Sequence, residues 1–319
     1  MREVVFTKKN KDKWQNYEKA LTGKSQLNPE DLTLIYLDLT DDLAYAATYY
    51  PDSKLTVYLN ELAGMAHRKI YKTKKTSGSA IKRFYLHDFP LMFYRYRQYL
   101  LFSFIVFLVF AAIGWFSTSQ NLDFARWIMG NGYVDMTLEN IKKGDPMAVY
   151  KQANEVDMFL GITINNIKVA LYTFMLGLTF GLGTLFNLMR NAIMLGAFQY
   201  FFLKQGVFWE SVRTIWIHGT IEISVIIVAG AAGFIMASGI LMPGTYTRMH
   251  SFVQKARDGL KVMISTIPFF IIAGFFEGFV TRHTEMPDWL AVLIILSSLT
   301  LIIYYYVLLP KKLYLQYEK

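Results

Sequence analysis

Two long apolar runs without a charged residue constrain this fold more than any other feature of the sequence. They are YLLFSFIVFLVFAAIGWFS (99–117) and WLAVLIILSSLTLIIYYYVLL (289–309). An α-helix rises about 1.5 Å per residue, so about 20 residues cross the hydrocarbon core of a bilayer, which is about 30 Å thick. A chain in which 54% of the 319 residues are apolar could not easily hide its surface in water. We therefore expect membrane-spanning helices.

The other apolar segments extend this expectation to an all-α, polytopic membrane helix bundle within residues 99–319. The third span, RNAIMLGAFQYFF, is short, which predicts a broken or tilted helix. The segment 118–160 contains Gly-rich turns and charges of both signs, and we expect short helices there on the extracytoplasmic side. Six spans are predicted, at about 99–117, 162–187, 190–204, 214–240, 262–281 and 289–309.

Residues 1–78 are predicted to form a cytoplasmic three-helix domain. Asn28 is a favourable N-cap and Pro29 a favourable first residue for the second helix. Pro51 ends that helix, and short joints of this kind favour antiparallel neighbours. KTKKTSGS (72–79) is typical of a linker.

The segment 79–98 is rich in aromatic residues and arginine, and we expect an amphipathic elbow helix along the headgroups. Its Phe and Tyr side chains would face the bilayer. A plain basic flank is the alternative, and both place this side in the cytoplasm. The cations expected at anionic headgroups are Lys82, Arg83, Arg95 and Arg97.

Basic segments indicate the orientation of the bundle. The segment RMHSFVQKARDGLK (248–261) and the tail KKLYLQYEK (311–319) are basic, and Arg190 is expected at the joint of the second and third spans. Because lysine and arginine collect in cytoplasmic loops, both termini are predicted to be cytoplasmic. This rule also accounts for the net charge of +9, and the sequence contains no nucleic-acid-binding motif.

Ionisable and amide side chains interrupt the predicted spans. His218 and Glu222 are four residues apart, so on a helix they share one face. A carboxylate in hydrocarbon costs a few kcal/mol, so Glu222 and Glu277 are expected to face the protein interior. The alternative for each polar residue is a simple hydrogen bond between helices. One buried polar cluster is predicted from Asn165, Asn166, Asn191, His218, Glu222, Glu277 and Arg282.

Small residues recur at spacings that let membrane helices approach closely, such as Gly177 with Gly181 and Gly274 with Gly278. Such pairs are also frequent by chance in a chain with 21 glycines. The positions expected to pack against other helices are Gly177, Gly181, Gly219, Gly233, Gly274 and Gly278.

No metal, cofactor or catalytic set is predicted. His218 and Glu222 have the spacing of ligands on a zinc helix, but the sequence is HGTIE, and no second histidine lies nearby along the chain. There is no phosphate loop, nucleophile elbow or cysteine.

The succession NN, GLTFGLGT, RNAIMLG, HGTIE, AGAAGF, MPG and FFEGFV resembles the stage II sporulation protein M family, also called DUF95. The N-terminal stretch LTLIYLDLTDDLAYAATYYPDSKLTVYLNELAGMAHRKIY is similar to the long bacterial members. Ile217 stands where the family often has Pro, and Asn191-Ala192 where it often has Asn-Gly.

The resemblance implies a polytopic protein of the bacterial inner membrane. The family's polar signature would fall on Asn165, Asn166, Asn191, His218, Gly219, Glu222 and Glu277. The namesake anchors a peptidoglycan-remodelling complex, but its minimal form lacks the long N-terminal domain, so a sporulation role does not transfer.

Three functions are compatible with the sequence. The first is a non-enzymatic scaffold or assembly subunit, which pairs as a homodimer through glycine faces and recruits other membrane or cytoplasmic proteins. The second is a transporter or channel-like permease that uses the buried Asn, His and Glu side chains. The third is an intramembrane enzyme with His218 as base and Glu222 as its orienting partner.

Overall fold

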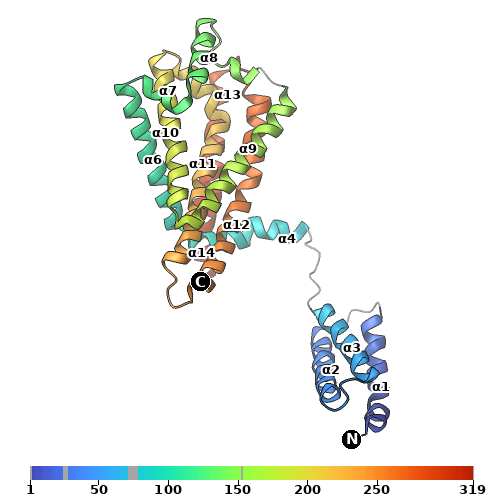
Figure 1. Ribbon diagram of the computed structural model, residues 1–319. Helices are drawn as coiled ribbons and strands as arrows, with labels where there is room; N and C mark the ends of the chain where they lie inside the picture. Colours follow the sequence, from blue (N-terminus) through green and yellow to red (C-terminus); the bar gives the residue numbers. More distant parts are fainter. Residues whose placement is uncertain (1, 24–27, 71–77, 152–153, 319) are drawn as a thin grey trace. The chain divides into compact units, whose positions relative to one another are not determined.

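The computed structural model describes residues 2–23, 28–70, 78–151 and 154–318 (Figure 1). They belong to two compact units, residues 1–77 and 78–319, which are described separately. All regular secondary structure in the described residues is helical, which confirms the predicted all-α fold. The predicted linker 72–79 falls almost wholly outside the described residues.

The N-terminal unit is a bundle of three helices, α1 (Glu3–Thr22), α2 (Pro29–Tyr49) and α3 (Lys54–Ile70). Helix α3 packs against both α1 and α2. Its core is apolar, and the residues with almost no exposed surface include Trp14, Leu39, Leu59, Leu62 and Ala66. The unit therefore has a hydrophobic core of its own.

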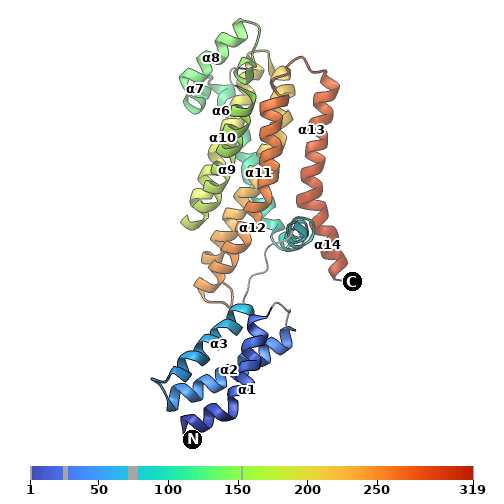
Figure 2. The same ribbon diagram turned by 90° about the vertical axis from the view of Figure 1, so that its right-hand side faces the viewer.

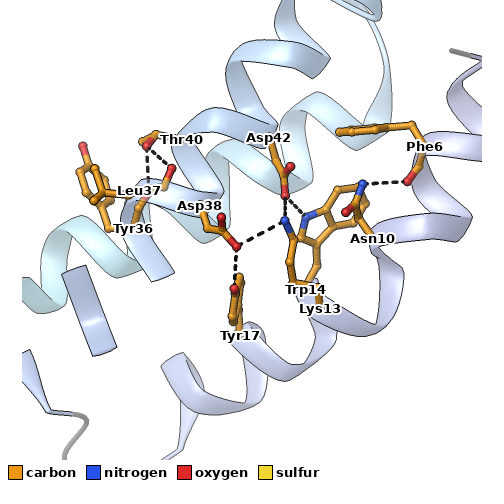
Figure 3. Close-up of polar contacts among 10 residues, drawn as sticks. All are labelled: Phe6, Asn10, Lys13, Trp14, Tyr17, Tyr36, Leu37, Asp38, Thr40 and Asp42. Atoms are coloured by element: carbon orange, nitrogen blue, oxygen red, sulfur yellow. Dashed lines mark hydrogen bonds and ion pairs between the residues drawn. The ribbon is translucent and has the colours of Figure 1, made fainter. Parts of the chain in front are cut away.

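Polar contacts fix α1 against α2 at the edge of this core (Figure 3). The indole Nε1 of Trp14 donates to Asp42 at 2.7 Å, and the hydroxyl of Tyr17 donates to Asp38 at 2.7 Å. Lys13 lies 2.6 Å from Asp42 and 3.4 Å from Asp38. Burial and the bond to Asp38 raise the pKa of Tyr17 to about 12, so its hydroxyl remains a donor at neutral pH.

The second unit begins with an elbow of three short segments, α4 (Gly78–Arg83), a π-helical turn η1 (Phe84–Asp88) and α5 (Phe89–Tyr94). The expectation that its aromatic side chains all face the bilayer is wrong. Phe89 and Phe93 are only 1% exposed and pack against Tyr306, because the elbow lies on the helix that ends the bundle. Lys82, Arg83, Arg95 and Arg97 are all exposed.

Five helices in the described residues are long and apolar enough to cross a membrane. The central one is α11. Within its apolar 18-residue stretch 83% is buried inside the protein, against 17% in the corresponding stretch of α6. Helix α11 packs against α6, α9, α10, α12 and α13. The five are α6 (Arg97–Gln120), α9 with η3 (Glu155–Thr179), α11 (Phe208–Leu241), α12 with η4 (Arg248–Val280), and α13 with η5 and α14 (Asp288–Tyr317).

A sixth helix, α10 (Leu182–Lys204), pairs with α6 but is less apolar, since it carries Asn187, Arg190 and Asn191. It differs from the short span predicted at 190–204. The turn before it lies at Phe180 and Gly181, whose φ angles are 58° and 83°. Arg190 is therefore inside α10 and not at the joint. The turn sequence is as apolar as the helices around it, so composition alone did not reveal it.

Short elements cap the two ends of this unit (Figures 1 and 2). The segment 118–160 forms α7 (Asp123–Met129), α8 (Asn131–Lys142) and the 3₁₀ turn η2 (Ala148–Lys151), where short helices were predicted. Helices α7 and α8 lie at one end of the long helices, and α4 and α14 lie at the other. Three of the spans named above consist of successive segments: α9 (Glu155–Met175) and η3 (Leu176–Thr179); α12 (Arg248–Phe275) and η4 (Phe276–Val280); and α13 (Asp288–Ile303), η5 (Tyr304–Leu308) and α14 (Leu309–Tyr317).

Glycines make the closest approaches between these helices. A Cβ on Gly177 would meet the carbonyl oxygen of Gly233, and one on Gly233 would meet the hydroxyl of Thr184. A Cβ on Gly274 would meet the hydroxyl of Thr163, and one on Gly278 would lie 3.0 Å from the carbonyl oxygen of Glu155. These contacts join α9 and α10 to α11, and α9 to α12 and η4.

Two predicted packing glycines differ from each other in what they contact. Gly219 meets only Ile215 and Ile223 of its own helix, so among the described residues it supports no contact between helices. Gly181 packs against Ala237 of α11 as predicted, and it also forms the left-handed turn before α10, a conformation that glycine adopts at little cost. The close pairing of α6 with α10 depends on two glycines that were not predicted, Gly114 and Gly196.

We expect Gly233→Ala to destabilise the protein, whereas Gly219→Ala leaves it unchanged or slightly more stable. The new methyl group at 233 would push Thr184 off its bond to the Thr173 carbonyl, a steric cost of about 1–3 kcal/mol. The methyl group at 219 has room, and alanine favours helix. Thermal unfolding of the two purified variants measures this, and equal midpoints would contradict it.

In the N-terminal unit, Tyr17→Phe removes the hydrogen bond to Asp38. It should lower the free energy of local unfolding of α1 by about 1 kcal/mol. Amide hydrogen exchange in peptides from Glu3–Thr22 of the whole chain should then be roughly fivefold faster. Tyr49→Phe is the control, since Tyr49 is 60% exposed and contributes its ring to Tyr45. Unchanged exchange in the Tyr17 variant would show that the bond does not hold α1.

Candidate functional site

Three ionisable side chains from two helical segments meet inside the second unit, residues 78–319, which is called the membrane unit from here on. His218 and Glu222 lie one turn apart on α11, and Glu277 comes from the π-helical turn η4 that continues α12. One nitrogen or oxygen ligand atom from each lies within 4.8 Å of the other two. His218 Nε2 is 3.8 Å from Glu277 Oε1. We call these three residues the His-Glu-Glu group.

Two further side chains orient the group. His218 Nδ1 lies 3.0 Å from the hydroxyl of Thr281, the residue directly after η4. The side chain of Asn166, on α9, is a polar neighbour of the Glu222 carboxylate. Since π-helical turns displace the residues that follow them, η4 determines where Glu277 and Thr281 point. Three helices therefore contribute to one polar site.

The site is largely withdrawn from the surface of the protein. His218 is 3% exposed and Thr281 1%, while the Glu277 side chain is 14% exposed. Glu222 is half-buried and Asn166 is 8% exposed. Carboxylates at such positions require partners, because an unpaired charge in an apolar environment is costly.

The predicted cluster is smaller in the structure than in the sequence analysis. Asn165 does not join it, because its side chain is exposed, whereas that of the next residue, Asn166, is buried. Asn191 donates to the carbonyl of Asn187 in its own helix at 2.8 Å. Arg282 pairs with Glu155 at 2.6 Å and so ties the end of η4 to the start of α9.

Several polar contacts were missed by sequence reasoning. Thr281 and Glu155 gave no signal beyond their proximity to Glu277 and to the second span. The buried Asn187 donates to Thr173 at 2.5 Å, and Thr184 donates to the Thr173 carbonyl at 2.8 Å. These bonds join α9 to α10. Threonine and asparagine within an apolar segment were the only available indication.

The chemistry of the His-Glu-Glu group permits two uses. Two close carboxylates can share a proton, and such pairs titrate as a unit. An imidazole nitrogen and two carboxylates are also a ligand set for divalent metals. The sequence analysis placed all three residues in one polar cluster but predicted no metal there, because HGTIE is not the H-E-x-x-H of zinc helices and no second histidine lies nearby.

A cavity of about 570 Å³ lies elsewhere in the unit, among α6, α11 and the last helix. Its walls are mainly leucine, isoleucine, valine and aromatic side chains, with Arg97 and Lys311 among them. Arg97 lies over the ring of Tyr94 at 4.4 Å. Glu222 and Glu277 do not line this cavity.

Comparison with protein families identifies the membrane unit. The family model Stage II sporulation protein M matches residues 103–282, more than half of the 319 residues. The chain belongs to the Stage II sporulation protein M family. The match runs from within α6 to Arg282, and it therefore contains the whole His-Glu-Glu group together with Asn166 and Thr281. With its apolar helices, this makes the chain a membrane protein of that family.

The N-terminal unit matches a separate model, a domain of unknown function (DUF8413), over residues 4–72. Comparisons with curated proteins and with solved structures found no match. The division into two family matches agrees with the two compact units of this Stage II sporulation protein M family member.

Neighbouring asparagines give a direct test of the cluster. Asn166→Leu should lower the free energy of unfolding of the purified protein by about 1–3 kcal/mol, since the half-buried Glu222 carboxylate loses a polar neighbour. Asn165→Leu should leave stability unchanged or raise it, because the side chain is exposed. Thermal unfolding in detergent measures both, and a larger loss for the Asn165 variant would refute the assigned faces of α9.

Proposed function

We propose that this protein is a scaffold subunit of a cell-envelope complex in the bacterial inner membrane, with both termini in the cytoplasm. The observation that supports this most is a polar stripe on the outer surface of the spanning helix α9. The stripe consists of Gly161, Asn165, Lys168 and Tyr172, which are all exposed. Their spacings of four, three and four residues place them along one side of the helix.

These side chains have no partner within the described part of the chain. Neither Asn165 nor Lys168 forms a hydrogen bond or an ion pair there, and a Cβ on Gly161 would meet nothing within 4 Å. Amide and ammonium groups that face acyl chains are costly, and in membrane helices they almost always face protein. A stripe of this kind is suited to contact with another membrane helix.

The chemistry of the stripe indicates the kind of partner. Lys168 favours a helix that presents a carboxylate, Asn165 can bond to an amide or hydroxyl, and Gly161 permits close approach. A symmetric pair of this chain through the stripe would bring two Lys168 side chains together, which like charges oppose. We therefore favour a different membrane protein as the partner at this face, and the homodimer remains a prediction.

The N-terminal unit would serve as the recruiting module of the scaffold. It has its own core and its own family match, as expected for a module that acts beside a membrane anchor. Leu34 and Leu37 on α2 are 64% and 54% exposed and lie three residues apart on one side. They provide a small apolar surface for a cytoplasmic protein. The permease alternative remains a prediction.

Photo-crosslinking in native membranes tests the proposed helix contact. A photoreactive amino acid in place of Asn165 or Lys168 should give a covalent adduct with a second membrane protein. The matched control is Val109 on α6, which is 50% exposed and apolar. We expect adducts at 165 and 168 at several times the yield at 109, and equal yields would contradict the proposal.

The chain contains no cysteine, so single-cysteine variants distinguish the two kinds of partner without background. Asn165→Cys and Gly161→Cys should give few disulfide-linked dimers under oxidising conditions if the partner is a different protein. Efficient dimers at both positions would instead show that a second copy covers the stripe.

A further inference from the structure

We propose that His218, Glu222 and Glu277 form a binding site for one divalent transition-metal ion. The site lies inside the membrane unit and is separate from the outward stripe of α9, so it stands independently of the scaffold proposal. The sequence analysis expected these three residues in one polar cluster without a metal, and the structure adds the closeness of their ligand atoms.

The ligand atoms are close to the separations that a metal requires. Tetrahedral zinc binds nitrogen and oxygen at about 2.0–2.2 Å, so its ligand atoms lie about 3.4 Å apart. In the protein the three atoms lie within 4.8 Å of one another, and the Nε2–Oε1 pair is at 3.8 Å. Small rotations of the two carboxylate side chains would bring them to coordination distance without movement of α11.

The neighbours of the group act as the outer partners of metal ligands usually do. Thr281 contacts Nδ1 of His218, so the opposite nitrogen, Nε2, faces Glu277. Asn166 is a buried polar neighbour of the Glu222 side chain. Hydrogen bonds of this kind orient metal-binding histidines and carboxylates, and they are typically worth 10–100-fold in affinity.

Charge balance supports a dication. Two ionised carboxylates and a neutral imidazole carry a formal charge of −2 in a site where His218 and Thr281 are almost fully buried. The cost of keeping such charges away from water is removed by an ion of charge +2 at the centre of the group. One nitrogen and two carboxylate oxygens suit zinc, manganese or iron(II), whereas calcium and magnesium prefer oxygen alone.

Three protein ligands leave a coordination position for water or another small ligand. Structural zinc sites are closed by four protein ligands, whereas sites with three usually retain a water molecule. In this protein the metal would also connect α11 to η4, and through Asn166 to α9. It would therefore stabilise the packing of three helices.

Metal binding should be measured on the full-length protein in nanodiscs, with any polyhistidine tag removed. After treatment with EDTA, titration with cobalt(II) should give one equivalent per chain and visible absorption bands of low-coordinate cobalt. Zinc(II) should displace the cobalt, and elemental analysis should then find one zinc per chain. Zinc should also raise the thermal midpoint of the wild-type protein, since a ligand that binds only the folded state stabilises it.

Near-isosteric variants keep the test independent of folding. Glu222→Gln and Glu277→Gln should each weaken cobalt binding by at least about tenfold, and Thr281→Val by about 10–100-fold. His250→Gln and Glu285→Gln are matched controls, because both residues are exposed and neither belongs to the group. Gel filtration and circular dichroism establish that each variant is folded.

The proposal is overturned if folded wild-type protein binds no more cobalt than the Glu222→Gln, Glu277→Gln double variant. It is equally overturned if the control variants lose binding to the same extent as the ligand variants. Neither result would affect the crosslinking test at Asn165, so failure of this inference can be distinguished from failure of the scaffold proposal.

Discussion

The close approach of helix backbones around α11 is the constraint on which the membrane unit depends. Lipid tails are as apolar as leucine, so helices in a bilayer associate through tight packing and hydrogen bonds, with little hydrophobic drive. Gly233 meets Thr184 and the backbone of α9, and Gly230 meets Ser103, whose hydroxyl donates to the Ile227 carbonyl at 2.7 Å. These contacts let five helices cover α11 and bury most of it.

Tight packing in turn determines which polar groups can lie inside. Asn166, His218 and Thr281 occupy positions where the helices already touch, and each has a polar neighbour. The same crossing of α9 over α12 and η4, made possible by Gly274 and Gly278, places Asn166 beside Glu222. The His-Glu-Glu group is thus a consequence of how α9, α11 and η4 pack. A proposed metal ion would strengthen an arrangement that small residues establish.

Helix α9 contributes to the buried polar group and to the exposed stripe through different residues. Its inner side contributes Asn166 to the polar group, and its outer side presents Asn165 and Lys168 without partners among the described residues. A helix with polar groups on both sides is unusual for contact with lipid. The membrane unit belongs to the Stage II sporulation protein M family. The proposed functions of this chain are inferred from the polar stripe and the His-Glu-Glu group and not from the fold.

The sequence by itself determined the helical class, the approximate positions of most spans, the separate N-terminal bundle and the family. These follow from local properties, namely apolar run length and helical spacing. It also placed His218 and Glu222 on one face, because a helix fixes that geometry within four residues. The sequence also predicted Glu277 in one cluster with them. Only the tertiary structure decided how close the three ligand atoms lie, that Asn165 is exposed, and that Gly114 and Gly196 pair α6 with α10. The turn at Phe180–Gly181 and the buried side of the elbow also depend on contacts between distant segments. In a membrane protein the apolar signal is nearly the same on lipid-facing and protein-facing sides, so the sequence alone does not distinguish which side of a helix is buried.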